Sequence, residues 1–342
     1  MWYLLLLVFL FPASILAAEK PSVNDTARFL AGLRVSGSSP LAHQMDTPAW
    51  REHAREMDRA WEGAKKRSLG RAGSWAYWAV PGNRSSDPCY YLFSGPDILY
   101  ARTLYPNASD YVLCGTEPVG GLPDLSRLSP AGLERSLRGV RRSLATLMRF
   151  AYFITADMRS DLGGDLGGTT PLICLFLART GCTVDSVERF SPGVSGVRIE
   201  FRSGWFQRQT AYYFNGDLSN GGSGRAVMAF CDRMGRDGMG LLKAASYLLH
   251  EPGFSNCRQF LLSHCRVLVQ DDSGLPLRAF RSADWNIKHY GNYSGTTGGA
   301  FSKYFQPDLA ARHAAESRGP LPFQLSYQWD TRKANALVAV RR

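Results

Sequence analysis

The spacing of apolar residues divides the chain into a helical beginning and an alternating remainder. Over residues 19–70, apolar side chains recur every three or four positions, with charged side chains between them. This period is typical of an amphipathic helix that packs one face against the rest of a protein. Thr47 and Pro48 strengthen the prediction, because they form an N-cap and a first-turn proline. We therefore expect a helical N-terminal extension over residues 19–70.

From Ser74 onward, short apolar and aromatic runs alternate with helical segments. The predicted strands are 75–80, 89–93, 111–115, 184–190, 197–202, 209–214, 266–270, 323–329 and 337–341, of which the last two would form a terminal hairpin. The predicted helices are 98–104, 130–151, 171–180, 239–249 and 255–264. The alternation predicts the α/β class, with a three-layer mixed sheet, flanking helices and the N-terminal helical extension. We expect a single α/β domain over residues 71–342, without an internal repeat.

Two local connections indicate how the strands pair. The run 89–93 is followed by a turn that contains Gly95, a short helix and the run 111–115, which is the pattern of a βαβ unit with parallel strands. The runs 184–190 and 197–202 are joined by a short turn rich in Ser and Gly, which predicts an antiparallel hairpin. The sheet is therefore expected to contain both parallel and antiparallel pairs.

The first segment of the chain indicates its destination. Residues 2–18 form an apolar run that ends in small residues, directly before the charged pair Glu19 and Lys20. This pattern is typical of a signal peptide, and an uncleaved N-terminal anchor is the alternative interpretation. No later stretch approaches 18 uninterrupted apolar residues. We therefore expect an exported protein, periplasmic or secreted, with no transmembrane segment beyond the signal peptide.

The chain is basic, which bears on its partners. It has 40 Lys and Arg against 29 Asp and Glu, a formal charge of +11. Such a protein can bind an anionic polymer, and export leaves an envelope polymer or glycan as the expected partner, with no nucleic acid. Two surfaces are candidates: the arginine face of residues 135–149 and the aromatic stretch Trp285–Tyr304. The alternatives are a solvated helix face and a loop packed on the sheet.

The seven cysteines become eligible for disulfides in an exported protein. Cys89 and Cys114 fall on neighbouring predicted strands and form the first candidate pair. No Cys-x-x-Cys or His-Glu-x-x-His is present, and the aspartates of residues 157–170 lack the order of a calcium loop, so no metal site is expected. The patterns of a nucleophile elbow and of a triphosphate-binding loop are absent from the sequence as well.

Polar turns follow three of the predicted strands and carry the candidate chemistry. Ligands of open α/β sheets bind beyond the carboxyl ends of the strands, where carboxylates can act as acid and base. The candidate catalytic residues are Asp97, Glu117, Asp271 and Asp272, and the candidate ligand-binding residues are Ser94 and Ser273. Ordinary turn chemistry is the alternative, because Asp, Ser and Gly are favoured in turns anyway.

Two resemblances add to this interpretation. The turn at Ser94-Gly95, followed by a helix and a strand that leads to Glu117, resembles the first βαβ unit of class I methyltransferases over residues 89–117. The resemblance implies that Glu117 binds the ribose of a cofactor. On a larger scale, residues 90–97, 115–120 and 269–276 are similar to an uncharacterised group of exported bacterial proteins, to which no activity is attached.

The sequence thus predicts an exported hydrolase or transferase that acts on a cell-envelope component through a carboxylate-lined cleft, with the cofactor and substrate unknown. The alternative is a non-catalytic periplasmic binding or assembly protein that uses the basic helix face and the aromatic stretch. Convergence of at least two of the four carboxylates, within about 8 Å at a concave surface, would favour the enzyme. Dispersed carboxylates would favour the binding protein.

Overall fold

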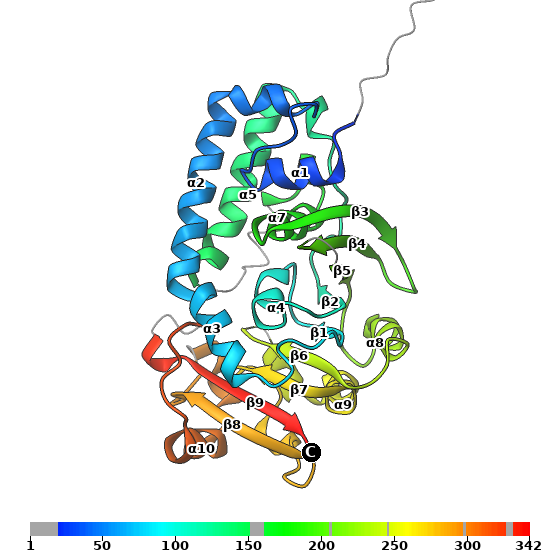
Figure 1. Ribbon diagram of the computed structural model, residues 1–342. Coiled ribbons are helices and arrows are strands. Elements are labelled where there is room, and N and C mark those ends of the chain that lie inside the picture. Colours follow the sequence, from blue (N-terminus) through cyan, green and yellow to red (C-terminus); the bar gives the residue numbers. More distant parts are fainter. Residues whose placement is uncertain (1–19, 151–160, 205–206, 245, 297–298, 326–330) are drawn as a thin grey trace, which may run out of the picture.

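The computed structural model describes residues 20–150, 161–204, 207–244, 246–296, 299–325 and 331–342 of the chain. They form a mixed nine-stranded sheet with helices on both faces (Figure 1). The predicted fold class is therefore confirmed. The predicted signal peptide lies outside the described residues.

The nine strands run in the order β3-β4-β5-β2-β1-β6-β7-β9-β8 across the sheet. Their bounds are β1 Cys89–Tyr91, β2 Asp110–Gly115, β3 Cys182–Phe190, β4 Gly196–Ser203, β5 Gln207–Asn215, β6 Gly238–Leu242, β7 Cys265–Gln270, β8 Trp285–Gly291 and β9 Asn335–Arg341. The pairs formed by β5, β2, β1, β6 and β7 are parallel, as the βαβ pattern predicts for β1 and β2. Their carboxyl ends therefore share one edge of the sheet.

Antiparallel strands extend the parallel centre on both sides. The hairpin of β3 and β4 adds to β5, which confirms its prediction from the sequence. On the other side, β9 is antiparallel to both β7 and β8. The amino end of β9, at Asn335, consequently lies at the same edge as the carboxyl ends of the parallel strands.

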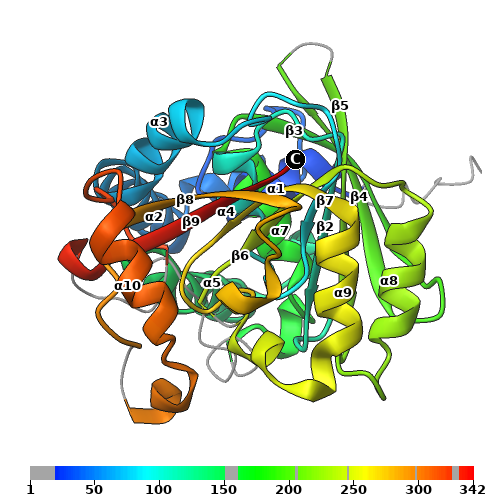
Figure 2. The same cartoon turned by 90° about the horizontal axis from the view of Figure 1, so that it is seen from below.

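The helices cover the sheet in two layers (Figure 2). Their bounds are α1 Val23–Leu30, α2 Pro48–Ala64, α3 Gly70–Ala79, α4 Ile98–Leu104, α5 Pro130–Phe150, α7 Thr170–Arg179, α8 Gly224–Asp232, α9 Ser255–His264 and α10 Pro307–Glu316. A π-helical turn, Lys65–Leu69, joins α2 to α3. Helices α1 to α7 contribute to the core on one face of the sheet, and α8, α9 and α10 contribute to the core on the other.

Alternating residues of the central strands supply both cores. Tyr91 and Leu113 belong to the core under α1 to α7, whereas Tyr90, Val112 and Cys114 belong to the core under α8 and α9. A parallel sheet that is covered on both faces needs apolar residues on both sides of each strand. This requirement explains why β1 and β2 appear in the sequence as continuous apolar runs.

Two predicted elements are wrong. Residues 75–80 belong mainly to helix α3, in which Ala72, Ala76 and Ala79 are buried at helical spacing while Tyr77 and Trp78 are exposed. The predicted domain boundary after residue 70 therefore falls within a continuous helical segment. Residues 239–249 were expected to be helical, but their first part is the buried strand β6. A short apolar run does not distinguish a buried strand from a helix.

The predicted pairing of Cys89 with Cys114 is also wrong. All seven cysteines are free and buried. Cys89 and Cys114 lie on neighbouring strands, but their side chains belong to the cores on opposite faces of the sheet. Neighbouring strand positions permit a disulfide only when both side chains point to the same side.

The end of the chain also differs from the prediction. Strand β9 pairs with β7 and β8. Of the predicted strand 323–329, residues 326–329 lie outside the described residues. The sequence analysis did not predict α8, α10 or β8. Within the described ranges, no helix combines the length and apolar character needed to cross a membrane.

The buried helix α7 provides a test of the packing. Phe176 is fully buried on α7, so Phe176→Ala should lower the free energy of unfolding by about 3–5 kcal/mol through lost contacts and a cavity. Phe305 is 43% exposed, and Phe305→Ala should cost less than about 1 kcal/mol. Urea denaturation of both variants measures the difference. Equal losses would contradict the central position of α7.

Candidate functional site at the carboxyl edge of the sheet

The loops after the parallel strands form two neighbouring polar regions. One is a cavity between the loops after β1, β2, β5 and β6, and it contains Glu117. The other is a buried cluster around Asp97, Lys243 and Asp271, at the carboxyl ends of β1, β6 and β7. We call the first the Glu117 cavity and the second the aspartate cluster.

The Glu117 cavity has a volume of about 190 Å³. Phe93 and Phe254 supply aromatic walls, and Gly95, Glu117 and Asp217 line its polar side. These residues come from loops far apart in the sequence that the parallel topology brings to one edge. A small concave site with apolar walls and few polar groups is typical of a ligand-binding site.

Glu117 is held firmly at the end of β2. Its side chain accepts a hydrogen bond from the Tyr213 hydroxyl at 3.2 Å, and its backbone carbonyl accepts bonds from Tyr213 at 2.9 Å and Asn215 at 2.7 Å. Burial, together with the nearby Glu117, raises the pKa of Tyr213 well above its ordinary value. The Tyr213 hydroxyl therefore remains a hydrogen-bond donor that orients the carboxyl group.

Glycines allow the loops after β1 and β2 to approach each other. A Cβ atom on Gly115 would lie 2.8 Å from the Cα atom of Gly95 and 2.3 Å from Oε2 of Glu117. Gly95 itself has φ +54°, in the left-handed region that favours glycine. Larger residues at these positions would separate the loops or displace Glu117.

Asp97 forms the centre of the aspartate cluster. Its Oδ2 atom lies 2.9 Å from Nζ of Lys243 and accepts a hydrogen bond from the Tyr91 hydroxyl at 3.2 Å. Its Oδ1 atom accepts a bond from the backbone N–H of Tyr100 at 3.1 Å, so Asp97 is also the N-cap of α4. Burial raises the pKa of Asp97, and the Lys243 ammonium opposes that shift.

Asp271 and Asp272 are fixed by separate partners. Asp271 accepts hydrogen bonds from the backbone N–H of Ala244 at 2.7 Å and of Ser273 at 2.8 Å. Asp272 accepts bonds from the Tyr247 hydroxyl and, at 2.9 Å, from the side-chain amide of Asn335. Burial and the neighbouring Asp272 raise the pKa of Asp271 to about 7.

The structure thus divides the predicted site residues into two groups. Asp97 and Asp271 contact the consecutive residues Lys243 and Ala244, so these two carboxyl groups belong to one cluster. Glu117 lies apart from this cluster, in the Glu117 cavity. The cluster carboxyl groups are buried and hydrogen-bonded within the chain, which favours a positioning role.

The two predicted ligand-binding serines make bonds within their own loops. Ser94 donates to the carbonyl of Gly95 at 2.7 Å and accepts from the backbone N–H of Cys114 at 3.2 Å, which connects the loop after β1 to β2. The Ser273 hydroxyl donates to Asp271 at 2.5 Å. Both hydroxyl groups therefore stabilise the edge of the sheet.

The sequence analysis missed Lys243 and Asp217. Lys243 directly follows β6, but the analysis placed it inside a predicted helix. Asp217 follows β5 and receives hydrogen bonds from the backbone and hydroxyl of Ser219 at 2.9 and 2.8 Å. In both cases the signal was a polar residue directly after an apolar run, at the position where ligands bind in open α/β sheets.

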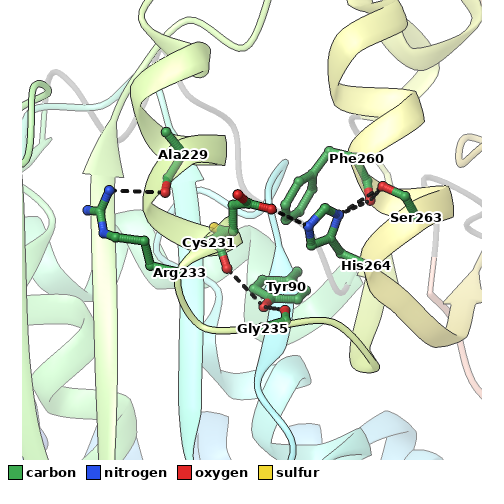
Figure 3. A network of polar contacts seen from close by, with 9 residues as sticks. Tyr90, Ala229, Cys231, Arg233, Gly235, Phe260, Ser263 and His264 are labelled. Carbon is green, nitrogen blue, oxygen red and sulfur yellow. Dashed lines mark hydrogen bonds and ion pairs between the residues drawn. The ribbon is translucent and has the colours of Figure 1, made fainter.

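His264 lies at the opposite edge of the sheet and has a structural role (Figure 3). Its Nε2 atom lies 2.7 Å from Oδ1 of Asp232, which connects α9 to α8, and its ring stacks on Phe260. Cys265, the next residue, begins β7. His264 is therefore beside the amino ends of the strands, where the sequence analysis favoured a structural histidine.

Side chains of the two predicted partner surfaces contact other residues of the same chain. On α5, Arg135, Arg138, Arg141 and Arg142 each form an ion pair with an acidic residue. The stretch 285–304 begins with β8, and Tyr304 stacks on Tyr247. These contacts lessen the support for the arginine face and the aromatic stretch as binding surfaces.

The buried ion pair provides the first test of the aspartate cluster. Asp97→Asn would leave Lys243 buried without its carboxylate, so it should lower the free energy of unfolding by about 3–5 kcal/mol. Asp185 forms a more exposed pair with Arg202, and Asp185→Asn should cost less than about 1 kcal/mol. Chemical denaturation measures both. A stable Asp97→Asn protein would argue against a positioning role for Asp97.

The raised pKa of Asp271 provides a second test. The folded protein holds this proton up to about pH 7, whereas the unfolded chain releases it near the ordinary pKa of an aspartate, 3.8. The free energy of unfolding should therefore fall as the pH rises from about 4 to about 7. Asp271→Asn should reduce that slope in urea denaturation measured across this range. An unchanged slope would show that Asp271 does not cause it.

Comparison of the chain with protein-family models, with curated proteins and with solved structures found no match. The evidence for function is therefore the sheet topology and the geometry of its carboxyl edge.

Proposed function

We propose that the protein is a methyltransferase that uses S-adenosylmethionine as its methyl donor. The observation that carries the proposal is the sheet topology. Seven strands run in the order β5-β2-β1-β6-β7-β9-β8, and among them only β9 is antiparallel to the others. This is the strand arrangement of class I methyltransferases, whose first βαβ unit residues 89–117 resemble. The hairpin of β3 and β4 extends the arrangement beyond β5.

The position of the Glu117 cavity supports the proposal. The chain crosses from β1 to β2 on one side and later continues from β6 on the other side of β1, so the strand order reverses beside β1. Ligands of open α/β sheets bind at such a reversal, outside the carboxyl ends of the strands. The cavity lies beside this reversal, among the loops that follow β1, β2, β5 and β6.

The residues of the cavity fit a nucleoside. The carboxyl group of Glu117 offers acceptor oxygens for ribose hydroxyl groups, and Asp217 offers acceptors at the rim for an exocyclic amino group. Phe93 and Phe254 provide apolar walls for a flat base. Gly95 allows a ligand to approach the backbone after β1 closely.

The chain's own residues would bind and orient the donor and acceptor. When bound, S-adenosylmethionine supplies an electrophilic methyl group. Tyr213 holds Glu117 in place through its hydroxyl, and the buried pair of Asp97 and Lys243 fixes the loop after β1 against the end of β6. A fixed loop keeps the two reactants in a defined relative position, which is the main contribution of a protein to such a transfer.

The sequence predicts a hydrolase or a transferase, and methyl transfer is the particular transferase reaction that we propose. The hydrolase interpretation receives less support, because the cluster carboxyl groups are buried and bonded within the chain. Export remains a prediction from residues 1–18. If that prediction holds, the acceptor is a cell-envelope component.

Binding of the donor tests the proposal directly. Isothermal titration calorimetry with S-adenosylmethionine and S-adenosylhomocysteine should show binding to the wild-type protein. Glu117→Gln retains the size of the side chain but weakens two charge-assisted hydrogen bonds, so affinity should fall about tenfold or more. Glu188→Gln, an exposed change on β3, is the matched control and should bind normally.

Two outcomes would overturn the proposal. The first is that neither compound binds the folded wild-type protein. The second is that Glu117→Gln and Glu188→Gln bind the donor equally well, which would place any binding outside the Glu117 cavity. Thermal denaturation of both variants shows that they are folded.

A further inference from the structure

A second, larger cavity lies between α2, α3, α5 and the segment before β9. It has a volume of about 670 Å³, and its lining includes the cations Lys66, Arg67 and Arg71 together with Ser68 and Thr331. None of the described residues that line it is acidic. We call it the cationic cavity.

The cationic cavity opens at the same edge of the sheet as the Glu117 cavity. Thr331 lies just before β9, whose amino end is at the carboxyl edge of the parallel strands. Ser68 and Arg67 lie near Tyr100, which belongs to the first turn of α4 and therefore follows β1 directly. Two independent connections thus place this cavity at the edge where α/β enzymes bind their substrates.

Three of the cations that line the cationic cavity are not paired with a carboxylate among the described residues. Among the described residues, Lys66, Arg67 and Arg71 have no carboxylate within ion-pair distance, whereas most arginines of α5 do. Arg67 and Arg71 instead donate hydrogen bonds to the carbonyl oxygens of Met148 and Pro322, both at 3.1 Å. These bonds orient the guanidinium groups and leave their charge available for an anionic ligand.

A π-helical turn places these cations. Residues 65–69 form a π-helical turn between α2 and α3, in which the backbone N–H of Gly70 bonds to the carbonyl of Lys65. Single π-helical turns within helices occur frequently at functional sites, since they interrupt the regular spacing of side chains. Here the turn contributes Lys66, Arg67 and Ser68 to the cavity lining.

An aromatic groove adjoins the cationic cavity and shares Arg71 with it. The groove has a volume of about 670 Å³, and Trp75, Trp78 and Tyr290 contribute aromatic surface to it. Trp78 is 84% exposed, which is unusual for so large an apolar side chain. Exposed aromatic rings beside unpaired cations suit a ligand with both flat apolar faces and negative charge.

Two lining residues of the cationic cavity, Arg67 and Ser68, are near Tyr100, which contacts the aspartate cluster. The hydroxyl of Tyr100 is buried without a hydrogen-bond partner of good geometry. Burial raises the pKa of Tyr100, and the nearby Ser68 and Arg67 oppose that shift. On the other side, Nζ of Lys243 lies 4.3 Å from the centre of the Tyr100 ring. Tyr100 therefore lies between the cavity residues Ser68 and Arg67 and the pair that fixes the loop after β1.

We propose that the cationic cavity and the aromatic groove together bind an acidic oligosaccharide as the methyl acceptor, which rests on the proposed methyltransferase function. Lys66, Arg67 and Arg71 bind its carboxylate or sulfate groups, and Trp78 stacks on the apolar face of a sugar ring. Two adjoining compartments of similar volume suit several sugar units better than a single small molecule.

A single-stranded nucleic acid offers similar chemistry but fits the molecule less well. It carries a phosphate on every unit, and its protein sites combine cationic grooves with rows of stacked aromatic residues. Here three unpaired cations are grouped in one compartment, and Trp78 is the one strongly exposed ring among the described aromatic residues of the groove.

The experiment measures binding of a hexameric oligogalacturonate to the full chain by calorimetry. The double variant Lys66→Glu/Arg71→Glu should bind at least tenfold more weakly, and Trp78→Ala about threefold to tenfold more weakly. Arg55→Glu is the matched control, because Arg55 is an exposed cation on α2 that does not line the cavity. It should bind as the wild type does, and thermal denaturation should show all variants folded.

Three results with the charged ligands would overturn the inference, and a fourth comes from a neutral one. The three are no binding of the hexamer to the wild type, an equal loss in Arg55→Glu, and tighter binding of an oligothymidylate of equal charge than of the hexamer. Maltohexaose, a neutral hexamer, should bind far more weakly than the acidic one. If it binds equally well, the cations do not recognise the ligand and the inference fails.

The two proposals fail separately. If S-adenosylmethionine binds but the acidic hexamer does not, the methyltransferase proposal stands and the choice of acceptor is wrong. If the hexamer binds and S-adenosylmethionine does not, the cavity is an acidic-glycan site of a protein with another function, so the acceptor role fails while the binding site stands.

Discussion

The buried ion pair of Asp97 and Lys243 determines the geometry of the functional edge. It joins the loop after β1 to the end of β6, on the two sides of the point where the strand order reverses. Asp97 also caps α4, so one side chain fixes a loop, a helix and a neighbouring strand. A buried charge that loses its partner is costly, and the arrangement therefore has few alternatives of similar free energy.

Much of the fold could be predicted from the sequence, because strong periods and turns are local signals. The parallel unit from β1 to β2 and the hairpin of β3 and β4 followed directly from spacing and turn residues. Residues 239–242 could not be assigned correctly, since burial on both sides removes the alternation that distinguishes strands from helices. Residues 75–80 are helical although their aromatic side chains favour a strand. Their conformation depends on the neighbours they pack against.

The candidate site was predictable only in part. The position of Glu117 after β2 and of Asp97 after β1 followed from topology, whereas their separation into a cavity and a cluster depends on the side-chain partners. Tyr213 holds Glu117 in the cavity, and Lys243 holds Asp97 in the cluster. In both pairs the two residues are far apart in the sequence. The cationic cavity was harder still to predict from the sequence. Its lining comes from α2, the π-helical turn, α3 and α5, and from Gln324 and Thr331 near the end of the chain.

The seven buried thiols have a consequence for where this protein can fold. Burial raises the pKa of every cysteine, for example to about 12 for Cys174 and Cys257, so the reactive thiolate is suppressed. The native state contains no cross-link that would require an oxidant. The folded structure therefore needs no oxidising compartment, and its thiols become open to oxidation only when the chain unfolds.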